Sequence, residues 1–244
     1  MKNLKPKLLT VAIMFVAIMN IHSQTLDEII EKNTQAIGGK EIIKSITSIY
    51  IENTIEVMGN ESASTTIILN GKGIKTKSDV NGQSLIQCYT NKGGWMINPM
   101  AGSSDPAVMT KDEYKNGESR INVSESFMDY ASKGNKVEFL GKEKFQNSDA
   151  FKIKVIMPDS VAIIYFIDAS SYYVVQTMMN VEMMGQKMDV ISKFNDYQKT
   201  DFGFVLPKTT TVNYGEQFSL GIKLKKAEFN KPVDQTIFDF GNLK

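Results

Sequence analysis

The sequence predicts a mainly β protein: a half-open antiparallel barrel, or strongly curved sheet, of about ten or eleven strands. Short segments rich in β-branched and aromatic residues recur along the chain, and tight-turn pairs such as Asn70-Gly71 and Asn81-Gly82 separate them. Helical periodicity is confined to a segment near the N-terminus and one in the middle. A sheet of this size tends to curl, so we expect both helical segments to pack on its concave face.

The first 23 residues have the features of a secretory signal peptide. Three lysines precede the apolar run Leu8–Ile18, which is shorter than the roughly 20 residues of a membrane span. Ser23 is a small residue at the expected cleavage position, and no cysteine near it could take a lipid anchor. We therefore expect residues 1–23 to be removed on export to the periplasm and residues 24–244 to form a single β domain.

The N-terminal helical segment follows directly. Thr25 and Glu28 have the spacing of a capping box, and apolar residues recur at helical intervals until Gly38-Gly39. A short second helix is expected at Lys40–Ser45. Because both segments are amphipathic, they need an apolar surface to cover.

The next segments alternate with a period of two and predict a meander of antiparallel strands. A short strand ending at Pro99 closes this first half, and the loop Met100–Ala107 follows it. The expected strands are Ser48–Met58, Ser62–Leu69, Gly73–Val80, Gln83–Thr90 and Trp95–Pro99.

A mid-chain insertion then interrupts the sheet. Thr110 has the character of a helix cap, and Glu118–Ser132 is predicted to be helical, with Phe127 and Met128 on its apolar side. Strands resume afterwards in consecutive hairpins. They are expected at Lys136–Leu140, Ala150–Met157, Val161–Ile167, Tyr172–Val181, Lys187–Phe194, Thr209–Tyr214 and Phe218–Phe229.

One of these hairpins, within Ser171–Tyr197, is rich in methionine. Strand alternation places Met179, Val181 and Met183 on one face and Met178 on the other. Methionine fills irregular gaps in cores, and it also adapts to varied apolar ligands. The hairpin is therefore either ordinary core or an adaptable wall of an apolar cavity.

Several catalytic and binding classes lack the residues they require. The only histidine, His22, lies in the expected signal peptide, which excludes imidazole-dependent catalysis and histidine-ligated metals in the mature chain. Cys88 is the only cysteine and is expected to be a small buried apolar residue. A net charge of +1 and one arginine, Arg120, argue against a nucleic-acid partner. The sequence thus predicts no enzyme, metal or cofactor; carboxylate-based hydrolysis is the one catalytic alternative.

Several short segments resemble the LolA/LolB-like family of outer-membrane lipoprotein-sorting proteins, the lipoprotein carriers, in its Bacteroidota form. They are Ala36–Gly39, Gly94–Pro99, Asp168–Tyr172, Asn195–Tyr197, Phe204–Pro207 and Phe229–Asp234. The resemblance implies a half-open barrel with helices as a lid, no enzymatic activity, and carriage of acyl chains between membrane-bound donor and acceptor proteins. Well-studied carriers hold the lid with an arginine on an early strand, and Arg120, in the mid-chain insertion, does not match that position.

The leading hypothesis is a monomeric periplasmic carrier that binds acyl chains of lipoproteins or other lipids. The alternative is a non-catalytic envelope protein that uses the same fold as a protein-binding platform. Ordinary core packing competes with ligand contact for every residue predicted to line an apolar cavity. These residues are Trp95, Met96, Met100, Phe127, Met128, Met179, Val181 and Met183.

Overall fold

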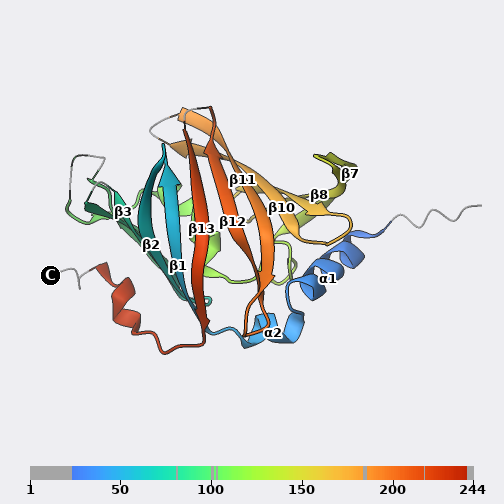
Figure 1. Ribbon diagram of the computed structural model, residues 1–244, viewed down its shortest axis with the longest axis horizontal. Coiled ribbons are helices and arrows are strands. Elements are labelled where there is room, and N and C mark those ends of the chain that lie inside the picture. Colours follow the sequence, from blue (N-terminus) through green and yellow to red (C-terminus); the bar gives the residue numbers. More distant parts are fainter. Residues whose placement is uncertain are drawn as a thin grey trace, which may run out of the picture.

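The computed structural model describes residues 24–80, 82–99, 102, 104–183, 186–216 and 218–240. Its central feature is one antiparallel sheet of 13 strands, in the order β6-β5-β4-β3-β2-β1-β13-β12-β11-β10-β9-β8-β7 (Figure 1). The strands are β1 (Ser48–Val57), β2 (Asn60–Leu69), β3 (Gly73–Val80), β4 (Gln83–Thr90), β5 (Gly93–Ile97), β6 (Ala107–Val108), β7 (Lys136–Phe145), β8 (Ser148–Ile156), β9 (Ala162–Asp168), β10 (Val174–Met183), β11 (Gln186–Lys199), β12 (Val205–Tyr214) and β13 (Phe218–Phe229).

The sheet consists of two meanders joined through the first and last strands. Strands β1 to β6 pair in sequence, as do β7 to β13, and β1 pairs with β13 along almost its whole length. Strands β6 and β7 form the two free edges, so the sheet is open. The predicted curved antiparallel sheet is confirmed. It has 13 strands rather than about ten or eleven: each of the twelve segments named above forms a strand, and the two-residue strand β6 begins in a segment predicted to be loop.

The strand register defines which residues face the concave side. Ile49 of β1 lies opposite Ile68 of β2 and Phe229 of β13, and all three pack in or against the main hydrophobic core. From β9, Ile163 and Tyr165 enter the same core. The core therefore lies on the concave side, towards one end of the sheet.

Helices α1 (Leu26–Ala36) and α2 (Lys40–Ser45) cover this end of the sheet (Figure 1). The predicted capping box is present, with Glu28 N donating to Thr25 Oγ1 at 3.3 Å and Thr25 N donating to Glu28 Oε2 at 3.0 Å. The helices bury four isoleucines in the core: Ile29, Ile37, Ile43 and Ile46. Gly38 has a φ of +127°, and a Cβ there would lie 2.8 Å from the carbonyl oxygen of Gly203, so the turn between the helices requires glycine.

The mid-chain insertion differs from its prediction. Instead of a helix over Glu118–Ser132, the chain forms helix α3 (Lys111–Lys115), a 3₁₀ turn η2 (Glu118–Ile121) and then a series of turns. Polar and β-branched residues at 122–124 favour local side-chain bonds over helix. The Lys133 ammonium donates to the carbonyl oxygen of Glu125 at 2.7 Å, which satisfies a backbone group that a helix would have paired. The insertion (green in Figure 1) still packs on the concave side, because Phe127 and Met128 lie in the main core.

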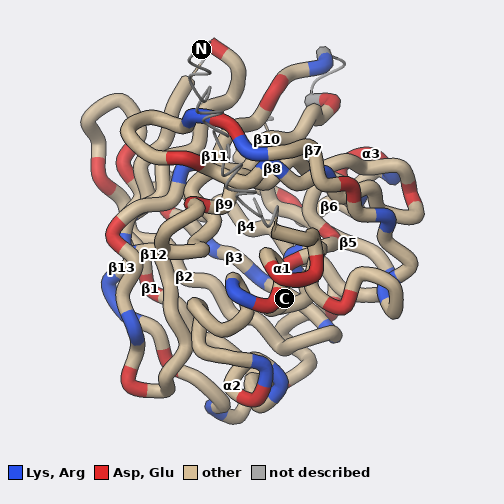
Figure 2. Tube along the Cα trace, turned by 90° about the vertical axis from the view of Figure 1, so that its right-hand side faces the viewer, with Lys and Arg blue, Asp and Glu red and all other residues tan. Residues whose placement is uncertain are grey.

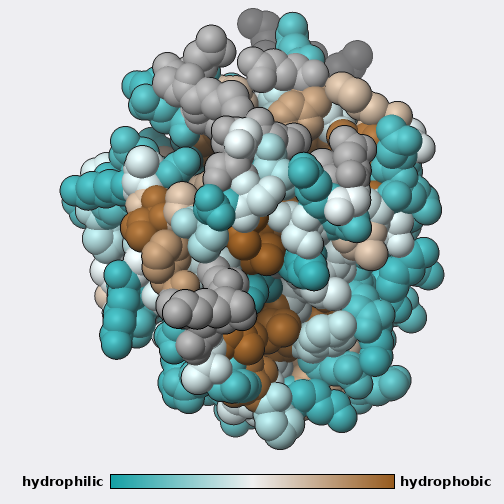
Figure 3. Space-filling view, turned by 90° about the vertical axis from the view of Figure 1, so that its left-hand side faces the viewer, coloured by the Kyte–Doolittle hydropathy of each residue, from teal (hydrophilic) through white to brown (hydrophobic). Residues whose placement is uncertain are grey.

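The C-terminal segment covers part of the opposite, convex face. The 3₁₀ turn η3 (Gln235–Phe238) places Phe238 in a cluster with Ile86, Cys88 and Trp95 of β4 and β5. Figure 3 views the side that carries β3 and this segment, where apolar atoms reach the surface in separate patches among hydrophilic ones.

Charged side chains of both signs are interspersed over the surface (Figure 2), in keeping with the net charge of +1. Within the described ranges, every helix is too short or too polar to cross a bilayer.

Candidate ligand-binding face

The concave face carries a strip of apolar side chains that the helices and the insertion leave partly exposed. We call this the concave strip. Ile55 lies opposite Ile222, and Val57 lies opposite Leu220, which in turn lies opposite Val212. The strip consists of Ile55 and Val57 of β1, Met188 and Val190 of β11, Val212 and Tyr214 of β12, and Leu220, Ile222 and Leu224 of β13, all of them partly exposed.

The orientation of the strip follows from cross-strand pairing. Val190 of β11 lies opposite Tyr214 on one side and Met179 of β10 on the other, and Met179 lies opposite the core residue Ile163. Directly paired residues point to the same face of a sheet. The strip is therefore continuous with the concave side of the main core.

The methionine-rich hairpin contributes two predicted residues to this face. Met179 packs against the main core, and Val181, 7 % exposed, lies opposite Met188 of the strip. Met178 lies opposite Ile164 and Ile191 and points to the other face, as predicted from strand alternation. The side chain of Met183 lies outside the described residues.

Two further predicted residues are part of the core. Phe127 is fully buried, and its ring meets the ring of Tyr165 edge-on with centroids 4.9 Å apart. Met128 is 4 % exposed, and it also lines the cleft described below. These two side chains hold the insertion against the sheet.

The remaining predicted residues are separated by strand alternation. Met96 packs on the concave side against the cluster of Ile74, Tyr89, Met109 and Ile121. Trp95, its neighbour, points to the convex face, where its indole nitrogen donates to the carbonyl oxygen of Phe238 at 2.8 Å. The structure therefore does not bring Trp95 to the same surface as Met96. Met100 lies outside the described residues.

The concave face also has polar positions, and two pairs of hydroxyls bond to each other across neighbouring strands. Ser78 Oγ donates to Ser64 Oγ at 3.0 Å, and the hydroxyls of Thr66 and Thr76 lie 3.1 Å apart. These pairs join β2 to β3 away from the concave strip. Because each hydroxyl has a partner, this wall can contact an apolar ligand without leaving those groups unsatisfied.

The insertion lies across the concave side and links distant strands. The Arg120 guanidinium lies over the ring of Tyr89 of β4, 5.0 Å from its centroid. Burial raises the pKa of Tyr89 and of Tyr214, while the charge of Arg120 partly opposes the increase for both. Arg120 is therefore close to β4 and β12 at once. On the strip, the Tyr214 ring stacks on Phe218 with centroids 4.6 Å apart.

A cleft lies between the N-terminal helices and the insertion. One part, of about 300 Å³, has Ile30, Ile43 and Met128 among its lining residues; a second, of about 410 Å³, shares Asp27, Ile30 and Asp129 with it. Lys40 of α2 and Asp129 of the insertion both line the first part and form an ion pair at 3.5 Å. This exposed pair contributes at most about 1 kcal/mol. The ion pair therefore adds little to the apolar packing between the helices and the insertion.

One acidic group near the core was not predicted. Burial raises the pKa of the Glu125 carboxyl, and the nearby Lys133 ammonium partly opposes this. Tyr165 is within hydrogen-bonding reach of the same carboxyl. We interpret the group as an internal anchor for the insertion. Among the residues that the structure describes, no three histidine, cysteine or acidic side chains are grouped to hold a metal ion.

The fold of this chain is similar to the folds of several solved structures. It is similar to LolA superfamily protein NE2245 from Nitrosomonas europaea, with a TM-score of 0.59 and 11 % identity over 89 % of this chain and 98 % of that one. A domain from Vibrio parahaemolyticus assigned to outer membrane lipoprotein sorting gives a TM-score of 0.56 and 13 % identity over 86 % and 95 % of the two chains. A DUF1329 family protein from Desulfovibrio piger gives a TM-score of 0.59 and 11 % identity over 89 % of this chain and 98 % of that one.

No protein-family model matches the sequence, and no curated protein matches it. The predicted resemblance to LolA-like proteins is confirmed by the similarity in fold to these solved structures. The assignment to the Bacteroidota form stays a prediction.

Proposed function

We propose that this protein binds acyl chains of lipids or lipoproteins on its concave face and carries them in the cell envelope, without a chemical step. The concave strip is the observation that carries the proposal. Its nine apolar residues come from four adjacent strands, face the interior of the curved sheet and stay partly exposed. Contiguous exposed apolar surface usually marks a site of interaction.

The hydrophobic effect sets the scale of the binding. Burial of a methylene group contributes about 0.8 kcal/mol, so a chain of about 14 carbons gains about 11 kcal/mol before the costs of association. Those costs are at least about 4 kcal/mol. The net value of about 7 kcal/mol or less corresponds to a dissociation constant of about 10 μM or weaker for a single chain. Such binding is reversible, as a carrier requires.

We also propose that the protein is located in the periplasm. Export by the segment 1–23, which lies outside the described residues, would place the domain in the periplasm, where lipoprotein carriage takes place. The fold shared with a domain assigned to outer membrane lipoprotein sorting supports this location. Membrane-bound proteins would act as donor and acceptor.

A pair of neighbouring substitutions on β12 tests the site. Val212 belongs to the concave strip, whereas Thr211 lies opposite Lys193 and Gly221 and points to the convex face. We expect Val212→Asp to weaken binding of a fluorescent fatty acid to the delipidated protein by at least tenfold, because the carboxylate would have to be desolvated beside the chain. Thr211→Asp should leave binding unchanged. Equal binding by wild type and both variants would rule out the concave strip as the site.

A further inference from the structure

The segment of the insertion from Met109 to Ile121, which we call the strap, connects the two halves of the sheet. On one side Met109 N donates to the carbonyl oxygen of Gly94 at 2.9 Å, and Tyr114 Oη donates to the carbonyl oxygen of Thr90 at 2.6 Å. On the other side Asn116 Nδ2 donates to the carbonyl oxygen of Glu182, at the end of β10, at 3.3 Å. The strap thus spans the concave side from β4 and β5 to β10.

The two attachments differ in kind. The first combines its two hydrogen bonds with close apolar packing: Met109, Ile121 and Tyr89 are each 7 % exposed or less. A Cβ at Gly117 would lie 2.3 Å from the ring of Tyr89, so the backbone lies directly on the ring. The second attachment is polar: it consists of the hydrogen bond from the Asn116 amide to Glu182 and of a pair of carboxyl groups. The second attachment is therefore the one that can open while the first holds.

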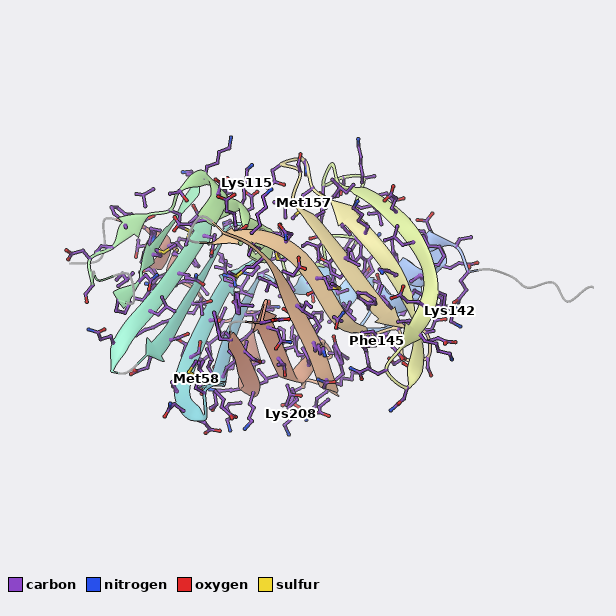
Figure 4. All side chains as sticks on the ribbon, turned by 90° about the horizontal axis from the view of Figure 1, so that it is seen from above. Met58, Lys115, Lys142, Phe145, Met157 and Lys208 are labelled. Atoms are coloured by element: carbon purple, nitrogen blue, oxygen red, sulfur yellow. The ribbon has the colours of Figure 1, made fainter. Side chains whose placement is uncertain are left out.

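The carboxyl pair consists of Glu118 in the strap and Asp159 in the turn between β8 and β9, whose side chains lie within hydrogen-bonding reach of each other. Asp159 Oδ1 accepts from the backbone N of Val161 at 3.2 Å, whereas Oδ2 is buried and has no hydrogen-bond partner among the described groups. In Figure 4, Lys115 of the strap and Met157 beside that turn lie along one side of the molecule, and Met58 lies on the opposite side.

Two carboxylates this close cannot both be ionised without a large electrostatic cost. Burial raises the pKa of the Glu118 carboxyl, and the hydrogen bond and charge of Asp159 raise it further. Tyr114 and Lys115 of α3, the other groups facing Glu118, act in the opposite direction. A single proton between the two carboxyls would give the buried Oδ2 of Asp159 its missing partner.

We propose that Glu118 and Asp159 share this proton when the strap is closed, so that the strap is an acid-closed gate across the concave side. The proton adds a hydrogen bond and removes one negative charge. Because the pKa of Glu118 is raised in the closed state, the attachment is fully present below the ordinary carboxyl pKa of about 4 and is lost as the pH rises through the raised pKa. Near neutral pH the repulsion of the two carboxylates favours release of the strap from the turn between β8 and β9.

Hydrogen–deuterium exchange tests the gate on the full chain with no lipid added. We expect the protection of residues 110–121 and 157–161, corrected for the intrinsic exchange rate, to fall between pH 4.5 and pH 7.5, because the shared proton that holds the strap closed is lost as the pH rises. The core strands β8 and β9 should keep their protection. Because no ligand takes part, failure of the acyl-chain proposal would leave this result unaffected.

Two amide variants separate the shared proton from other effects of pH. Asp159→Asn supplies an N–H donor to Glu118 at every pH, so protection should stay high and independent of pH; Glu118→Gln should do the same and serves if the first variant fails to fold. The control Glu41→Gln, an exposed carboxyl on α2, should keep the wild-type pH dependence. Protection independent of pH in the wild type, or an unchanged pH dependence in both amide variants, would overturn the proposal. So would recovery of protection at neutral pH by added calcium, which would make the pair a cation site instead.

Discussion

Replacement of Phe127 by alanine separates the two roles that its position allows, core packing and ligand contact. The side chain is fully buried and meets Tyr165 edge-on at 4.9 Å. Removal of such a ring typically costs about 3–5 kcal/mol, of which an aromatic pair contributes about 0.5–1.5 kcal/mol. We expect a loss of about 4 kcal/mol in the free energy of unfolding. At about 2–4 °C per kcal/mol for a domain of this size, the melting temperature should fall by about 8–16 °C.

Urea unfolding followed by circular dichroism measures this loss, and Phe240→Ala is the control. Phe240 is 45 % exposed, so its removal should cost less than about 1 kcal/mol. Binding of the fluorescent fatty acid by Phe127→Ala, measured well below its melting temperature, should match that of the wild type. A stability loss below about 1 kcal/mol together with weaker fatty-acid binding would refute the assignment of Phe127 to the core.

Three further predictions follow from close contacts. Gly117→Ala places a methyl group against the ring of Tyr89 and should lower the free energy of unfolding by about 1–3 kcal/mol; a neutral effect in thermal melts would show that the strap does not lie on this ring. Burial raises the pKa of the Cys88 thiol to about 12, so a thiol reagent at pH 8 should label it only after unfolding, and rapid labelling of the native protein would contradict its burial. Trp95→Phe removes the 2.8 Å bond to Phe238 and leaves that carbonyl with only the long 3.6 Å hydrogen bond from the Cys88 thiol, at a cost of about 1 kcal/mol in chemical denaturation. The C-terminal segment should also become more accessible to proteases, and unchanged proteolysis would argue against this bond as its anchor.

The sheet could be predicted because its signals are local. Turn pairs such as Asn70-Gly71 and the alternation along Phe218–Phe229 fix strand ends and faces without knowledge of the fold. The helix predicted over Glu118–Ser132 failed because its apolar residues, Phe127 and Met128, are buried by tertiary contacts in a series of turns. Apolar spacing alone does not distinguish that arrangement from a helix.

The candidate site was predicted only in part, and strand alternation explains why. Trp95 and Met96 are neighbours on a strand, so they must point to opposite faces, and the sequence already contained that signal. The alternation of Leu220, Ile222 and Leu224 could have identified β13 as part of the apolar wall. Pairing between β1 and β13, or between Glu118 and Asp159, depends on the three-dimensional fold and leaves no local signal.

The most direct test of the central claim is whether the purified protein carries an acyl lipid. Native mass spectrometry, combined with organic extraction of the same sample, gives the mass and class of any bound molecule. Our proposal predicts a folded protein with a bound acyl lipid that a fluorescent fatty acid displaces, and loss of that lipid in Val212→Asp but not in Thr211→Asp. A lipid-free protein that neither takes up nor exchanges the fluorescent fatty acid would contradict it.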